Sequence, residues 1–163
     1  SSVTTTRKFC GYLNEPYLFF YLPRFNNKLK IMTKAPQKIY VVDNGFVQGA
    51  AFNVNSNLGR LLENQVFVEL MRRGYIPGRT LFYYRSRNDK EIDFVTRTGT
   101  KVEQLIQVCY DMSSAKTRKR ELDALTESAE ELSCDNLLVV SSDQQETIEW
   151  KSRKIKVIPI YDF

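Results

Sequence analysis

The sequence predicts a single α/β domain, and three observations support this fold class. The chain has 163 residues, which is enough for one substantial core and too few for two full domains. Apolar residues make up 42% of the chain and aromatic residues 12%, as is typical of a packed globular protein. A helical pattern precedes three strand-like segments, and a second helical pattern precedes further strands, without internal repeats or low-complexity segments.

Residues 1–36 are predicted to contain the end of a winged-helix domain and a linker. The stretch SVTTTRKFCGYL can form a short helix, and Pro16 separates it from the aromatic run YLFFYL, which favours a strand. A helix that leads into a hairpin is half of a winged helix. The next stretch, NNKLKIMTKAPQK, is polar and basic and predicts a second hairpin arm or a linker. We place the domain boundary near residue 36 and assign residues 37–163 to the α/β domain.

The α/β domain is expected to begin with a strand and a long helix. The segment KIYVVDNGF, residues 38–46, has the pattern of a buried strand that ends in an Asn-Gly turn. Residues 57–75, NLGRLLENQVFVELMRRGY, predict a helix of about four turns that ends at Gly74. Glu63 shares the buried side of this helix, which is unusual for an acid. The apolar stripe consists of Leu62, Val66, Phe67 and Leu70, and the solvent-facing side is expected to contain Asn64, Gln65, Glu69 and Arg72.

Three strands and a second helix are expected to follow. The strands are LFYYRS (81–86), EIDFVTR (91–97) and KVEQLIQVCY (101–110), and a tight turn joins the last two. Residues 114–132 predict the second helix, because apolar residues recur on one face. Beyond this helix, the stretches NLLVVSS, ETIEW and KIKVIPIYDF predict further strands.

The composition excludes several kinds of site. The chain has no histidine, so an imidazole base or a histidine-ligated metal is excluded. Cys10, Cys109 and Cys134 are odd in number and lack CxxC spacing, which argues against a disulfide framework or a zinc site. No stretch approaches the roughly 20 apolar residues of a membrane span, and the first residues lack the pattern of a secretory signal. We therefore expect a soluble, cytoplasmic protein without a membrane partner.

The net charge of +5 is concentrated near the N-terminus. Residues 1–40 contain Glu15 as their only acid. The basic residues in this segment are Arg7, Lys8, Arg24, Lys28, Lys30, Lys34 and Lys38. An isolated basic segment favours a polyanion such as nucleic acid, and a solvated surface or linker is the alternative.

The order of the elements and the placement of the acids resemble the PD-(D/E)XK nuclease superfamily. More closely, the stretches KIYVVDNGF, GRLLENQVFVELMRRGY, YYRSRNDKEIDFV, LIQVCYDM, TRKRELDAL and VIPIYDF resemble the C-terminal domain of unknown function found in AAA-superfamily ATPases of bacteria and archaea. The resemblance covers about the last 125 residues. It implies a restriction-endonuclease-like core with a mixed central sheet flanked by helices, in the order α-β-β-β-α-β, preceded by the remnant of a winged helix.

The resemblance implies a site at Glu63, Asp93, Gln107 and Cys109. Glu63 matches the helix acid and Asp93 the strand acid, while Gln107 stands at the position of the third acid and Cys109 at that of the lysine. In an active member, Glu63, Asp93 and Gln107 would hold Mg²⁺ against the scissile phosphate, and the lysine would help to activate water. A thiol cannot replace an ammonium group, so we expect a degenerate site that requires no metal.

In a degenerate site, the two acids are expected to form buried hydrogen bonds or ion pairs with Arg85 or Arg87. Cys109 is then expected to pack as a small apolar residue. Contacts to nucleic acid are expected from basic residues before the Asp93 strand and at the start of the second helix, although a solvated helix start is the alternative for the second group. These residues are Arg85, Arg87, Lys90, Lys116, Arg118 and Lys119.

The sequence thus favours a nuclease-like domain that binds nucleic acid or docks to an ATPase module. The resemblance places that module upstream, and ATP would bind there, because this chain has no GxxxxGK[ST] motif. The alternative function is an active Mg²⁺-dependent DNA phosphodiesterase.

Overall fold

A computed structural model describes residues 12, 18–26, 28–32, 34–45 and 58–163. The helix predicted in SVTTTRKFCGYL lies outside the described residues except for Tyr12. Among the described residues, no helix combines the length and the apolar composition that crossing a membrane requires.

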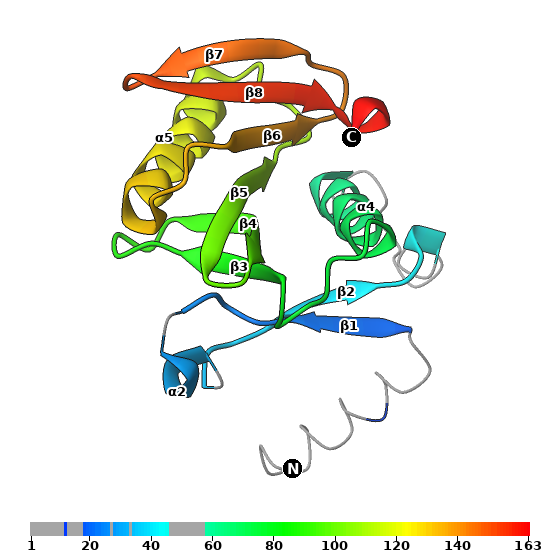
Figure 1. Cartoon of the computed structure of the whole chain (residues 1–163). Helices are drawn as coiled ribbons and strands as arrows, with labels where there is room; N and C mark the ends of the chain where they lie inside the picture. Colours follow the sequence, from blue (N-terminus) through cyan, green and yellow to red (C-terminus); the bar gives the residue numbers. More distant parts are fainter. Residues whose placement is uncertain (1–11, 13–17, 27, 33, 46–57) are drawn as a thin grey trace.

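A six-stranded mixed sheet forms the centre of the fold, in the order β3-β4-β5-β6-β8-β7 (Figure 1). The first three strands are antiparallel, β5, β6 and β8 run parallel, and β7 closes the edge antiparallel to β8. The strands are β3 (Leu81–Arg85), β4 (Glu91–Thr98), β5 (Lys101–Val108), β6 (Leu137–Ser141), β7 (Glu146–Trp150) and β8 (Arg153–Pro159), followed by the short helix η2 (Ile160–Asp162).

Two long helices, α4 (Leu58–Arg72) and α5 (Ala115–Leu132), cover opposite faces of this sheet (Figure 1). On the α4 side, Val66, Phe67 and Leu70 of the predicted stripe pack in one cluster with Phe94 and Ile106. On the α5 side, Leu122 and Leu125 pack on Leu105. Burial of these apolar faces holds both helices on the sheet. The predicted order of helix, three strands, helix and strand is therefore confirmed, and the fold is a mixed α/β fold with a central sheet flanked by helices.

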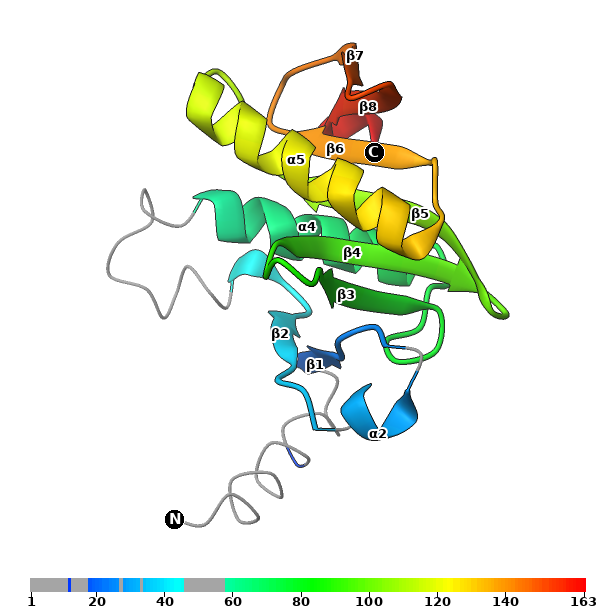
Figure 2. The same cartoon turned by 90° about the vertical axis from the view of Figure 1, so that its left-hand side faces the viewer.

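A separate two-stranded sheet consists of β1 (Phe19–Leu22) and β2 (Lys38–Val41), which pair antiparallel. Both views place it next to β3 (Figures 1 and 2). Between the two strands, the polar stretch forms the one-turn helix α2 (Leu29–Met32). The boundary proposed near residue 36 thus falls between two strands that are hydrogen-bonded to each other.

Asn64 attaches this two-stranded sheet to α4. Its Oδ1 accepts a hydrogen bond from the Val41 N–H at 2.8 Å, and its Nδ2 donates to the Val41 carbonyl at 3.0 Å. Helical periodicity predicted that Asn64 faces water, and this prediction is wrong, because the side chain is buried against β2. The amide pairs with both backbone polar groups of one residue, as a neighbouring strand would do.

Candidate functional site

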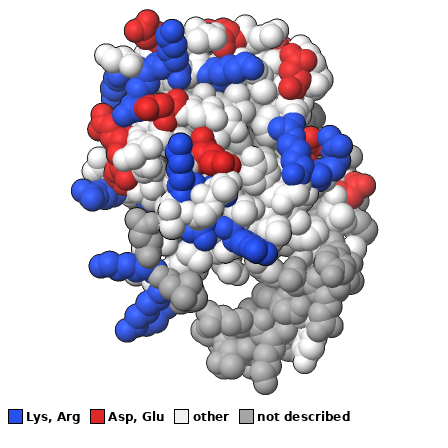
Figure 3. All heavy atoms as spheres, viewed as in Figure 1, with Lys and Arg blue, Asp and Glu red and all other residues white. Residues whose placement is uncertain are grey.

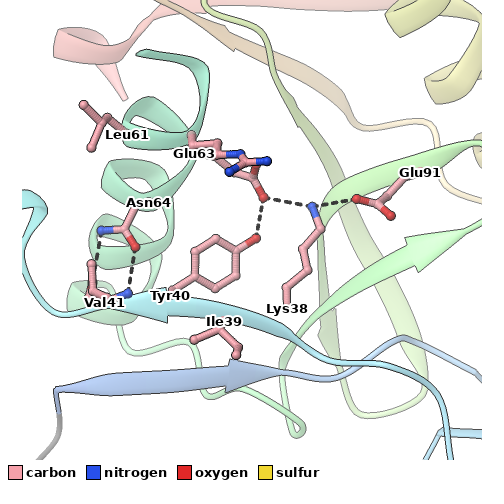
Figure 4. A pocket seen from close by; sticks show the side chains of 9 residues that line it. Lys38, Ile39, Tyr40, Val41, Leu61, Glu63, Asn64 and Glu91 are labelled. Atoms are coloured by element: carbon pink, nitrogen blue, oxygen red, sulfur yellow. Dashed lines mark hydrogen bonds and ion pairs between the residues drawn. The ribbon is translucent and has the colours of Figure 1, made fainter. Parts of the chain in front are cut away.

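Three carboxylates surround the ammonium group of Lys38, and Figure 4 shows two of them, Glu63 and Glu91. Its Nζ lies 2.8 Å from Glu63 Oε1 on α4, 2.8 Å from Asp93 Oδ1 and 2.9 Å from Glu91 Oε1 on β4. Burial lowers the pKa of Lys38, but the charges of Asp93 and Glu63 outweigh this effect and raise the pKa well above its ordinary value. Lys38 therefore stays charged and joins β2 to α4 and β4.

Tyr40 provides a second contact to the helix acid. Because side chains alternate along a strand, Tyr40 lies on the same face of β2 as Lys38. Its hydroxyl donates a 2.6 Å hydrogen bond to Glu63 Oε1, and its ring stacks on Phe67 with centroids 4.2 Å apart. Burial and the negative charge of Glu63 raise the pKa of Tyr40 well above its usual value. The hydroxyl is therefore a fixed donor to Glu63 at neutral pH.

A β-bulge orients Asp93 towards Lys38. Phe82 pairs with Val95 and Tyr84 pairs with Ile92, so β4 contains one more residue than β3 between these two pairs. As a result, Ile92 and Val95 enter the core on the α5 side while Phe94 enters the core on the α4 side. Such a bulge changes the direction of the side chains next to it. Asp93 lies in this bulge and reaches the Lys38 ammonium group.

The carboxylate of Asp93 is buried and fully engaged. While Oδ1 contacts Lys38, Oδ2 accepts a hydrogen bond from the Val108 N–H at 2.9 Å. Burial raises the pKa of Asp93 to about 7, with a further contribution from the charge of Glu63, and Lys38 opposes the shift. The surroundings of Asp93 thus disfavour a charged carboxylate, and the ammonium group of Lys38 partly offsets this effect.

Gln107 contacts Asp93 but is directed towards α5. Its Oε1 accepts a long 3.4 Å hydrogen bond from the Asp93 N–H, and its Nε2 donates to Glu121 Oε2 at 2.7 Å. Glu121 is buried and also binds the guanidinium group of Arg120. The structure therefore brings Gln107 next to the backbone of Asp93, while its amide group is engaged on the α5 side.

Cys109 is not part of the carboxylate cluster. It is buried in the core on the α5 side, and its thiol donates to the Asp111 carbonyl at 3.3 Å. Burial raises the pKa of the thiol to about 11, and the charge of Glu121 adds to this shift. The side chain packs as a small apolar residue and remains a neutral thiol at physiological pH.

The side chains expected to hold Mg²⁺ do not fit that ion. The ammonium group of Lys38 binds Glu63 Oε1 and Asp93 Oδ1, so it occupies the place of a Mg²⁺ ion that these two oxygens would share at about 2.0–2.1 Å. The carbonyl oxygen of Gln107 accepts from the Asp93 backbone instead. Within the described part of the chain, no group of three or more His, Cys, Asp and Glu residues is arranged to hold a metal ion. The cluster is an ion-pair network in which three carboxylates share the single ammonium group of Lys38.

Comparison with known proteins identifies the family. The family model described as "Domain of unknown function (DUF4143)" matches residues 58–163. The chain belongs to the DUF4143 family. An uncharacterized protein of Methanocaldococcus jannaschii is 33% identical over 156 residues, which cover 92% of this chain and 34% of that protein. An uncharacterized protein of Haemophilus influenzae is 31% identical over 108 residues, or 66% of this chain and 26% of that protein. No solved structure matches the chain.

The carboxylate cluster contains residues from inside the DUF4143 region and residues that precede this region. Glu63, Glu91 and Asp93 lie inside the matched region, whereas Lys38 and Tyr40 lie before residue 58. The sequence predicted Arg85 or Arg87 as partners of the two acids, and the structure places Lys38 there instead. Arg85 Nε lies 3.3 Å from Asp89 and 3.7 Å from Glu91. The signal that could have identified Lys38 is its position two residues before Tyr40 in a strand with a buried face.

The basic residues expected to bind nucleic acid divide into two groups in the DUF4143 fold. Arg118 forms a bidentate pair with Glu146, and Lys90 pairs with Glu127. The exposed residues are Arg85, Arg87, Lys116 and Lys119. The acids that compensate the basic start of α5 are therefore Glu146 on β7 and Glu121 on the helix itself.

Proposed function

We propose that this chain is a nuclease-like domain of the PD-(D/E)XK type that binds DNA without cutting it, within a larger AAA-type ATPase. The observation that carries the proposal is the position of Lys38, whose Nζ lies 2.8 Å from both Glu63 and Asp93. An ammonium group bound between these carboxylates occupies the position where a metal ion shared by both acids would bind.

Element order also supports the nuclease-like ancestry. The acid of α4 and the acid of β4 come from separate elements and meet at one point, next to the third strand of the sheet. This is the arrangement that the family resemblance implies. The ammonium group now comes from β2 instead of from position 109, so the cluster has a structural role in place of a catalytic one.

The place of the domain within a larger protein is supported by the relatives. The chain spans 34% and 26% of the length of the two curated proteins that it matches. A domain of this size inside a longer chain is consistent with the ATPase module that the resemblance places upstream. ATP would bind to that module.

Two assays test the proposal. In a plasmid-nicking assay with Mg²⁺ or Mn²⁺, the natural protein and the Asp93→Ala variant are expected to give the same background. Metal-dependent cutting that disappears in Asp93→Ala would instead establish the alternative, a DNA phosphodiesterase. In a binding assay with labelled duplex DNA, affinity is expected to fall as the salt concentration rises. If no salt-sensitive affinity is found, docking to the ATPase module is the better assignment.

A further inference from the structure

A basic cavity of about 290 Å³ lies between the segment that follows β1, the end of β3 and the end of α5. Four of its lining residues are cations, namely Arg24, Lys28, Arg85 and Arg87, and Glu131 is the single carboxylate among those lining residues. The lining thus has an excess of three positive charges. Figure 3 shows the same trend on one face of the molecule, where the lower part around α2 carries Lys and Arg while the acidic side chains lie above it.

The backbone around Arg24 is fixed by β3. Tyr83 donates its N–H to the Pro23 carbonyl at 3.2 Å, and Phe25 donates its N–H to the Tyr83 carbonyl at 2.6 Å. The ring of Phe25 then packs edge-on against Phe82, with centroids 5.4 Å apart. Arg24 lies between these two attachments, and its Nη2 donates to the Arg85 carbonyl at 2.7 Å. One wall of the cavity is therefore held as an extension of the sheet edge.

The turn that carries Arg87 is also rigid. The Ser86 N–H donates to the Lys90 carbonyl at 2.8 Å, and the Asp89 N–H donates to the Ser86 carbonyl at 3.1 Å. The hydroxyl of Ser86 binds Glu127, and the N–H of Arg87 binds Glu131, so α5 anchors the turn at two points. This wall is therefore formed before any ligand binds, which lowers the entropic cost of binding.

Several donors of the cavity lack strong partners among the described residues. The Nε of Arg24 is buried and has no hydrogen-bond partner there. Arg85 Nε is 3.3 Å from Asp89 and 3.7 Å from Glu91, which is longer than a good charge-assisted hydrogen bond. The side chains of Lys28 and Arg87 are exposed. Guanidinium groups present planar pairs of N–H donors that match the oxygens of a phosphate.

Two features oppose an anion at one end of the cavity. The C-terminal end of α5 carries about half a negative charge from the helix dipole, and Glu131 adds a full one. However, Glu131 already accepts hydrogen bonds from the Tyr84 hydroxyl and the Arg87 N–H. The four cations outweigh both features, because the lining keeps an excess of three positive charges.

We propose that this cavity binds a phosphate of the DNA backbone, with Arg24 and Arg87 as the principal donors and Lys28 and Arg85 as supporting charges. This inference rests on the proposed function, since it specifies where the domain contacts DNA. A phosphate contact of this kind positions the duplex and is independent of its base sequence.

Fluorescence anisotropy with a labelled duplex DNA tests the inference on the 163-residue chain. The variants Arg87→Gln and Arg24→Gln are compared with Lys154→Gln, which removes the same charge from an exposed position on β8. Removal of one phosphate contact is expected to weaken binding several-fold and to reduce the slope of log K against log salt by about 0.9. Lys154→Gln is expected to leave the slope unchanged. Circular dichroism checks that each variant is folded. If Arg24→Gln unfolds, the test relies on Arg87→Gln, because the Arg87 side chain is exposed.

A second measurement separates this inference from the proposed function. Inorganic phosphate is titrated into the natural protein, and the N–H resonances of the arginine side chains are followed by NMR. Shifts at Arg24 and Arg87, together with the loss of slope, support the inference. If DNA binds with salt sensitivity but Arg24→Gln and Arg87→Gln behave like Lys154→Gln, the inference is overturned and the proposed function stands. If the natural protein binds no DNA, both are overturned.

Discussion

Lys38 and Asp93 are 55 residues apart in the chain, and yet their Nζ and Oδ1 atoms lie 2.8 Å apart in the fold. The same Nζ binds Glu63 from a third element, so one ammonium group compensates acids from α4 and β4. A buried carboxylate needs such compensation, because desolvation of a charge costs several kcal/mol. The contact therefore explains how acids from two separate elements can lie together inside this domain.

The first prediction concerns the loss of this ammonium group. We expect Lys38→Met to lower the free energy of unfolding by about 3 kcal/mol, because it leaves Asp93 and Glu63 without their cation. This is the lower end of the range for breaking a buried ion pair, since the side chains of Lys38 and Glu63 remain 19% and 22% exposed. Urea unfolding measures the change. Lys154→Met on the exposed side of β8 is the control, and an equal loss in both variants would contradict the role of Lys38.

The second prediction concerns pH. The folded-state pKa of Asp93 is raised from 3.8 to about 7, so between these values the folded protein binds a proton that the unfolded chain releases. The contribution of Asp93 to stability is thus fully present below about pH 4 and is lost as the pH rises through about 7. Relative to Asp93→Asn, the natural protein is expected to lose stability over this window, at up to about 1.4 kcal/mol per pH unit. Urea unfolding at several pH values measures the difference, and a difference that does not change with pH would contradict it.

The third prediction concerns the hydroxyl of Tyr40. The Tyr40→Phe variant keeps the ring on Phe67 but removes the donor to Glu63. We expect a loss of about 1.5–3 kcal/mol, as for other hydrogen bonds to charged groups. Thermal unfolding gives the value. Tyr161→Phe, at a position with 74% exposure, is expected to change stability by less than about 0.5 kcal/mol. A Tyr40→Phe variant as stable as this control would show that the bond to Glu63 contributes nothing.

The fourth prediction concerns the reactivity of Cys109. Its thiol is buried, and its pKa is raised to about 11, so the reactive thiolate is scarce at neutral pH. We expect iodoacetamide to modify Cys109 far more slowly in the native protein than in urea, as measured by mass spectrometry of the peptide that contains it. Rapid alkylation of the native protein would indicate that the thiol lies in an accessible site instead of the core.

Much of the fold follows from local sequence pattern. The apolar residues of α4 recur with the period of a helix. The glycine at position 99 predicts the turn between β4 and β5, because its φ there is 59°, a value that glycine adopts readily. These signals depend on residues close together in the chain, and the structure confirms the elements that they predicted. Glu63 was also recognised locally, because an acid on the apolar side of a helix is unusual.

The partners of these residues could not be predicted in the same way. Lys38 is 25 residues from Glu63 and 55 from Asp93, so no local period connects them. In the sequence, Lys38 belongs to the basic N-terminal segment, whereas the pairing of β1 with β2 places it beside α4. The bulge that orients Asp93 is likewise visible only in the register between β3 and β4. The pairing at the centre of the site is therefore set by tertiary contacts, whereas an acid such as Glu63 can be identified from the local sequence pattern.

The fifth prediction concerns Asn64, for which helical periodicity gave the wrong environment. Because its amide holds both the N–H and the carbonyl of Val41, Asn64→Leu leaves two backbone groups of β2 without their partners. We expect the free energy of unfolding to fall by about 1–3 kcal/mol and the Val41 amide to exchange much faster with deuterium. Gln65→Leu, on the exposed side of the same helix, is the matched control and should leave this amide protected. Hydrogen exchange measured by NMR distinguishes the two variants. If Val41 is equally protected in both, Asn64 does not hold β2 against α4, and the contacts of Lys38 and Tyr40 must hold it there instead.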